Sequence, residues 1–141
     1  MVATSGSRLL PSAALDALRT RLLPMATILT PNIPEARLLL ADAGYGHVPV
    51  EKISDLVFIA QLVRATGPQW VLIKGGHCPF RKDGTLAKSP EEKEIVVDVL
   101  YGGGEQFFRI ETPYHETQHT HGTGCSLACK SCLQAMCRAY F

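Results

Sequence analysis

The sequence carries almost no net charge and has no hydrophobic run long enough to cross a membrane. Its 14 lysines and arginines nearly balance 13 aspartates and glutamates, so that the formal net charge is +1. A chain with this balance has no general attraction for nucleic acids or anionic membranes. The first residues also lack the basic start and the uninterrupted apolar stretch of a signal peptide. We therefore expect a cytoplasmic protein without a nucleic-acid or membrane partner.

Cysteine is scarce through most of the chain and odd in number. Of 5 cysteines, four lie in the stretch from Cys125 to Cys137. A secreted disulfide-bonded domain usually spreads an even number along the chain, so we expect reduced thiols. On a helix Cys125, Cys129 and Cys132 would share one face, but a rigid helix cannot wrap four ligands around a zinc ion. We expect these thiols to act as small buried hydrophobic side chains.

Hydrophobic periodicity predicts a single α/β domain. The 141 residues are 46% hydrophobic and 19% charged, which is typical of one globular domain, and they contain no internal repeat. Segments with helical spacing alternate with short apolar runs, which predicts a layered domain with a mostly parallel sheet and an antiparallel hairpin edge. The expected elements are a strand end at 2–6, helices at 12–23, 32–44, 53–65 and 123–140, strands at 26–30, 70–73, 95–101 and 106–111, and an exposed loop at 78–93.

Polar motifs follow the apolar runs at three places. Ligands of α/β sheets bind beyond the carboxyl ends of the strands, so we expect the three motifs to meet there. A carboxylate with an amide can hold a metal ion or its water shell, a lysine can neutralise phosphates, and N–H groups at a helix start can bind migrating oxyanions. The combination predicts phosphoryl transfer. The motifs are Asn32-x-x-Glu35, Lys74-Gly75-Gly76-His77 and Gly122-Thr123-Gly124-Cys125.

Each motif also has a purely structural interpretation. Asn32 can be the N-cap of the next helix, with Glu35 as its capping-box partner, and Pro34 fits the first turn. Lys74 can be a solvated strand end. The residue types alone leave both interpretations open. Structural roles are expected for the histidines at His77, His119 and His121.

Together and in this order, the motifs resemble those of the hydroxymethylpyrimidine/phosphomethylpyrimidine kinases of thiamine biosynthesis, which belong to the ribokinase-like superfamily. The resemblance extends from Val2 to Ala128 and is carried by segments 29–36, 71–77 and 119–128. It implies a three-layer αβα fold, with residues 1–141 forming one partial kinase domain that contains the nucleotide-binding and catalytic half. The N-terminal part of the family's fold, with most contacts to the pyrimidine, is expected to be missing, and residues 129–141 form a divergent tail.

The resemblance implies ATP- and Mg²⁺-dependent phosphorylation of 4-amino-5-hydroxymethyl-2-methylpyrimidine and then of its monophosphate. Glu35 and Asn32 match the family's pair near the metal. Cys125 stands where many relatives carry an aspartate base, and a helix start would favour the thiolate that accepts the substrate's hydroxyl proton. The expected anion hole is formed by Gly122, Thr123 and Gly124. The expected ATP contacts are Lys74, Asn32, Thr120 and Val97, the last in the hairpin region that flanks the adenine.

Two other functions are compatible with the same motifs. A pyridoxal or pyridoxamine kinase shares the fold, although Gly-Thr-Gly-Cys favours the pyrimidine branch because pyridoxal kinases often carry aspartate at its last position. A non-catalytic chain could instead bind a nucleotide, or a partner through an open sheet edge. A chain without its N-terminal half is expected to have impaired activity. The expected assembly is a homodimer formed through the sheet.

Overall fold

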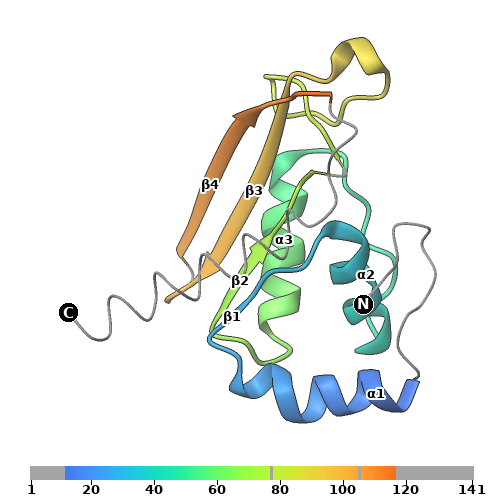
Figure 1. The fold of residues 1–141 in the computed structure, drawn as a ribbon, viewed down its shortest axis with the longest axis vertical. Coiled ribbons are helices and arrows are strands. Elements are labelled where there is room, and N and C mark those ends of the chain that lie inside the picture. Colours follow the sequence, from blue (N-terminus) through green and yellow to red (C-terminus); the bar gives the residue numbers. More distant parts are fainter. Residues whose placement is uncertain (1–11, 77, 105, 117–141) are drawn as a thin grey trace.

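Four strands form one sheet in the spatial order β1-β2-β3-β4 (Figure 1). The computed structural model describes residues 12–76, 78–104 and 106–116. β1 and β2 pair in parallel, whereas β3 is antiparallel to both β2 and β4. The α/β class and the antiparallel hairpin edge are therefore confirmed. The strands are β1 (Ile28–Leu29), β2 (Trp70–Ile73), β3 (Ile95–Gly102) and β4 (Gln106–Pro113).

Parallel pairing is confined to β1 and β2, so the expected predominance of parallel strands is not found in the described residues. These two strands are joined through α2 (Ile33–Asp42) and α3 (Ile53–Arg64). The two helices return the chain to the edge of the sheet at which β1 begins, so that β2 can run parallel to β1. The connection from β2 to β3 stays at the edge where β2 ends. There the Phe80 N–H donates to the Ile95 carbonyl oxygen at 2.8 Å. The chain consequently enters β3 in the opposite direction.

The β3–β4 hairpin is closed by glycines. Gly103 and Gly104 have φ values of 54° and 84°, in the left-handed region that favours glycine. The pairing is continuous from Ile95 opposite Pro113 to Gly102 opposite Gln106. The sequence signal for a hairpin at this position is confirmed, and β4 extends two residues beyond its expected end.

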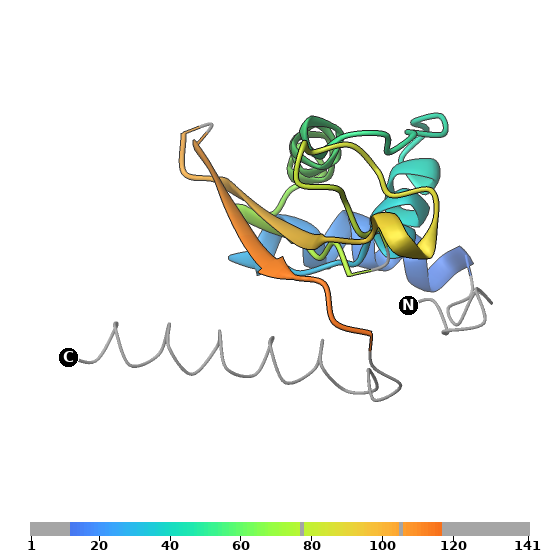
Figure 2. The ribbon, with the colours of Figure 1, turned by 90° about the horizontal axis from the view of Figure 1, so that it is seen from above.

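Helices α2 and α3 cover one face of the sheet, and the hydrophobic core lies between (Figure 2). Alternate residues of β2 and β3 point into it, including Val71, Ile73, Val97 and Val99, all fully buried. From α3 the side chains at the helical repeat are buried against them. Of the three expected layers, the described residues contain the sheet and this helical layer. The buried α3 residues are Ile53, Leu56, Ile59, Ala60 and Val63.

The segment before β1 differs from the single helix expected at 12–23. It is α-helical at Ser12–Ala17 (α1), π-helical at Leu18–Leu22 and 3₁₀-helical at Leu23–Met25. Leu15 and Leu23 are both buried. Residues eight positions apart diverge by about 80° around a regular α-helix, and the wider π turn reduces that divergence.

Two further expectations need correction, the strand at 26–30 and the exposed loop at 78–93. The strand expected at 26–30 is shortened to β1, because only Ile28 and Leu29 have partners on β2 and Pro31 has no N–H to donate. The segment 78–93 is not uniformly exposed, since Phe80 is fully buried in the core.

None of the helices in the described ranges has the length and apolar character needed to cross a membrane.

Candidate functional site

The turn from β1 into α2 is organised by a reciprocal pair of hydrogen bonds. The Glu35 N–H donates to Asn32 Oδ1 at 2.8 Å, and the Asn32 N–H donates to Glu35 Oε2 at 3.0 Å. These two bonds satisfy N–H groups that a helix start leaves without intrahelical partners. The capping box predicted from the sequence is confirmed, with Pro34 in the first turn. The structural role of Asn32 and Glu35 is thus established.

Lys74 lies beside Asn32. The two residues form an isolated parallel bridge, and the Lys74 N–H donates to the Pro31 carbonyl oxygen at 2.9 Å. This follows from the parallel pairing of β1 and β2, since both strands end at the same edge of the sheet. The Lys74 side chain is half-buried, not a fully solvated strand end. Two of the three predicted motifs therefore meet as expected.

Gly75 holds this edge close to β3. Its N–H donates to Asp98 Oδ1 at 2.8 Å. A Cβ at position 75 would overlap the Val97 carbonyl oxygen and lie 2.9 Å from the carbonyl carbon, so the approach requires glycine. Asp98 had not been predicted as a site residue. Its signal in the sequence is a single carboxylate within the otherwise apolar run Val96-Val97-Asp98-Val99-Leu100.

The edge thus combines a lysine, an amide and carboxylates within adjoining turns. A cation here can neutralise charge on phosphates, and carboxylate and amide oxygens are ligand types that Mg²⁺ accepts. Among the described residues, no group of three or more His, Cys, Asp or Glu could hold a metal ion. Mg²⁺ usually binds through one or two carboxylates together with waters and substrate phosphates, so Asn32 and Glu35 suit a partial ligand set.

The predicted nucleotide contact Val97 lies on β3 beside this edge, where its carbonyl oxygen faces Gly75. Val97 is fully buried in the core, so its side chain is enclosed by other apolar side chains, and its contact with a nucleotide stays a prediction. The predicted base and anion hole lie outside the described residues, as does the rest of the C-terminal motif. These residues are His77, His119, Thr120, His121, Gly122, Thr123, Gly124 and Cys125.

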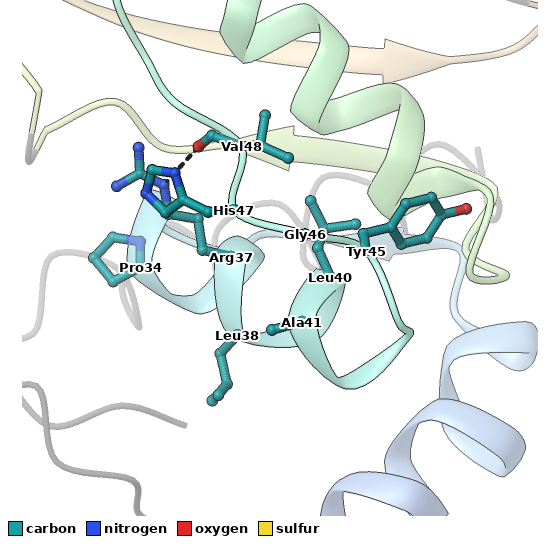
Figure 3. A pocket seen from close by; sticks show the side chains of 9 residues that line it. All are labelled: Pro34, Arg37, Leu38, Leu40, Ala41, Tyr45, Gly46, His47 and Val48. Atoms are coloured by element: carbon teal, nitrogen blue, oxygen red, sulfur yellow. Dashed lines mark hydrogen bonds between the residues drawn. The ribbon is translucent and has the colours of Figure 1, made fainter.

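A cavity of about 400 Å³ lies beside α2 (Figure 3). Arg37 and His47 lie at one end of it, where Arg37 Nε donates to the Val48 carbonyl oxygen at 3.1 Å. Asn32, Glu35, Lys74 and Val97 are not among its lining residues, and sequence reasoning had not identified it. It is lined by Pro34, Arg37, Leu38, Leu40, Ala41, Tyr45, Gly46, His47 and Val48.

Cys78 follows the Lys74 turn and is half-buried. Burial raises the pKa of its thiol, while the nearby Arg37 guanidinium acts in the opposite direction. The thiol is therefore held neutral at physiological pH, which favours a packing role over a nucleophilic one.

Comparison with known proteins identifies a family over almost the whole chain. The family described as "Phosphomethylpyrimidine kinase" matches residues 1–137. The hydroxymethylpyrimidine/phosphomethylpyrimidine kinase of Streptomyces coelicolor is 42% identical over 127 residues, which are 90% of this chain and 39% of that protein.

Solved kinase structures share the fold. Bacillus subtilis pyridoxal kinase, determined as an ADP complex, aligns with a TM-score of 0.60 and 32% identity over 84% of this chain and 39% of its own. Phosphomethylpyrimidine kinase from Clostridium difficile aligns with a TM-score of 0.55 and 29% identity over 77% of this chain and 38% of its own. The chain therefore spans about two fifths of the length of each of these relatives.

Proposed function

Because the chain belongs to the phosphomethylpyrimidine kinase family, we propose that it transfers the γ-phosphate of ATP to 4-amino-5-hydroxymethyl-2-methylpyrimidine and then to its monophosphate. The observation that carries the proposal is the bridge between Asn32 and Lys74 at the shared edge of β1 and β2. That bridge brings two of the three motifs together, in a chain 42% identical to a hydroxymethylpyrimidine/phosphomethylpyrimidine kinase.

ATP is the proposed phosphate donor. ADP in the related Bacillus subtilis pyridoxal kinase supports a nucleotide site in this fold. The ammonium group of Lys74 would neutralise negative charge on the phosphates of ATP. Mg²⁺, when bound with ATP, would further neutralise the phosphate charge, and Asn32 and Glu35 are the proposed residues for holding the ion or its water shell. Thr120 and Val97 are proposed as further nucleotide contacts.

Cys125 is the proposed base. Its thiolate would take the proton of the substrate hydroxyl while that oxygen attacks the γ-phosphorus and ADP departs with the electrons of the broken P–O bond. The N–H groups of Gly122, Thr123 and Gly124 would donate to the oxygens of the migrating phosphoryl group. Chemistry of this kind depends on positioning and charge, which is why the proximity of the strand-end motifs matters.

Pyridoxal phosphorylation is the second candidate function. The Bacillus subtilis pyridoxal kinase aligns with a higher TM-score, 0.60, than the Clostridium difficile pyrimidine kinase, 0.55. The Gly-Thr-Gly-Cys sequence favours the pyrimidine substrate, since pyridoxal kinases often carry aspartate in place of Cys125. A non-catalytic nucleotide-binding role is the third candidate. A cytoplasmic location and association through the sheet stay predictions.

Binding and transfer by this chain can be tested separately. Radiolabelled phosphate transfer from ATP is measured with hydroxymethylpyrimidine, with its monophosphate and with pyridoxal, and ATP binding is measured by calorimetry. We expect Cys125→Ala to abolish transfer to the pyrimidine and to leave ATP binding unchanged. Retained ATP binding without transfer to any substrate would contradict both enzyme proposals and support the third candidate. Transfer to pyridoxal alone would favour the second.

Lysine substitutions test the nucleotide site itself. Lys74→Met is expected to weaken ATP binding by about tenfold, which corresponds to about 1.4 kcal/mol, because it removes a cation from the phosphates. Lys82→Met is the matched control, since Lys82 is exposed in the segment that leads to β3. Equal ATP affinity in the two variants would contradict the proposed role of Lys74.

A further inference from the structure

β4 is an edge strand that exposes three large apolar side chains. It ends the strand order, and all eight of its residues are exposed. Phe107, Phe108 and Ile110 are 56%, 52% and 48% exposed. No other strand in the described ranges pairs with its outer edge, so a row of backbone donors and acceptors faces outward there. A long and apolar edge strand is a template for pairing with another strand.

The two faces of β4 carry different side chains. Phe107, Arg109 and Glu111 lie on the face that α2 and α3 cover, because their register partners on β3 are the core residues Tyr101, Val99 and Val97. Arg109 Nε and Glu111 Oε1 form an ion pair at 2.6 Å on this face. The alternate residues occupy the opposite face. These are Gln106, Phe108, Ile110 and Thr112.

The sequence of β4 is complementary to itself in one antiparallel register. If Ile110 lies opposite Ile110 of a second copy, Arg109 lies opposite Glu111 of that copy, and the same pair is repeated by symmetry. Phe108 then lies opposite Thr112 of the second copy. Centring the pairing on Arg109 or on Glu111 instead would place like charges directly opposite each other, which is destabilising. Among these three registers, charge therefore favours the one centred on Ile110.

We propose that two copies of this chain associate through antiparallel pairing of their β4 strands about a two-fold axis at Ile110. The pairing joins two four-stranded sheets into one and provides partners for the outward backbone groups of both edges. On the face opposite the helices, the two Ile110 side chains are flanked by Phe108 of each copy. Phe108 already packs against Trp70 with a ring-centroid distance of 6.5 Å. The paired strands thus connect two apolar patches across the interface.

The proposed interface lies away from the edge where Asn32 and Lys74 meet. That edge is formed where β1 and β2 end, at the opposite side of the strand order from β4. Association can therefore be disrupted without altering Asn32 or Lys74. The dimer dissociation constant can therefore be measured in variants that leave the Asn32–Lys74 bridge unchanged.

Charge reversal in the full chain tests the register. Sedimentation velocity over a wide concentration range measures the dimer dissociation constant of the chain and of three variants. Arg109→Glu and Glu111→Arg each create two like-charge pairs and are expected to weaken the dimer by about tenfold. Combining both substitutions restores opposite charges and should return the dissociation constant to within about twofold of its original value.

Two controls separate the register from other effects. Lys82→Glu changes the net charge by the same amount as Arg109→Glu at an exposed position outside β4, and it should leave the dissociation constant unchanged. Circular dichroism of every variant reports whether the fold is retained. A chain that remains monomeric at all concentrations would overturn the proposal. So would a double variant no better associated than the single ones.

A cysteine at the two-fold axis gives an independent measurement. Opposed residues of an antiparallel pair have Cα separations of about 4.5–5.5 Å, which a disulfide can span. Ile110→Cys is therefore expected to form a disulfide between copies, whereas Thr112→Cys should not, because Thr112 faces Phe108 of the second copy. Since the chain contains 5 cysteines of its own, the linked peptide is identified by mass spectrometry. Linkage at position 112 in place of 110 would refute the register.

Discussion

Replacing Gly75 by alanine should destabilise the protein and disturb the candidate site at once. The new Cβ would overlap the Val97 carbonyl oxygen, which belongs to the backbone of β3 and cannot rotate away. The turn after β2 must therefore move outward, which breaks the bond from the Gly75 N–H to Asp98 Oδ1. Overpacking in a core costs about 1–3 kcal/mol, and a lost hydrogen bond to a charged group about 1.5–3 kcal/mol. Partial relaxation leaves an expected loss of about 3 kcal/mol.

Gly76→Ala is the matched control for this substitution. A Cβ on the neighbouring glycine would meet nothing within 4 Å, so its effect should stay within about 0.5 kcal/mol. Urea unfolding followed by the fluorescence of Trp70, the single tryptophan of the chain, measures both variants. Gly75→Ala should also weaken ATP binding, because Lys74 moves with the turn. Equal unfolding free energies for the two alanine variants would refute the inferred contact between Gly75 and β3.

Two further predictions concern the same edge. Asn32→Ala removes the acceptor that caps α2 and should lower the free energy of unfolding, measured in urea, by about 1 kcal/mol. Asn32→Asp keeps an acceptor and should change this free energy by less than about 0.5 kcal/mol. Similar losses for the two variants would argue against the cap. Because burial raises the pKa of the Cys78 thiol in the native state, the unfolded chain releases this proton first, and stability should fall as pH rises from the ordinary thiol pKa toward the native one. Alkylation of Cys78 at alkaline pH, followed by mass spectrometry, should be slower in the native protein than in urea. Cys78→Ala should remove the contribution of this thiol to the pH dependence of the unfolding free energy. Equal alkylation rates in the native and unfolded protein would contradict the burial effect.

Local sequence signals predicted most of α2, α3, β2 and the β3–β4 hairpin. Each depends on groups close together in the chain. The Asn32 and Glu35 side chains bond within one helical turn, and the glycines after β3 permit the positive φ of a tight turn. The apolar spacing of α3 determines its buried face without reference to any particular partner. Such features can be predicted because their stabilising contacts are local.

Features that depend on distant partners could not be predicted in this way. β1 is short because only Ile28 and Leu29 are paired with β2, a partner that lies about 40 positions further along the chain. The burial of Phe80 depends on its bridge to Ile95, which closes the loop onto the core. Asp98 enters the candidate site only because β3 places its carboxylate against the Gly75 N–H, 23 positions away in the chain. Periodicity carries no information about such pairings.

The sequence by itself determined which chemical groups are present and where each lies within its own strand or helix. Examples are the cap at Asn32, the lysine after β2 and the opposite charges of Arg109 and Glu111 on β4. Only the tertiary structure decided which of these groups meet. Parallel pairing of β1 with β2 brings Lys74 to Asn32, and the Gly75 contact holds that edge against β3. The same sheet order leaves β4 at the outer edge, with Arg109 and Glu111 exposed there. The physical reason is that strand pairing joins residues far apart in the chain, so the choice of partner depends on the whole packed sheet and not on any local segment.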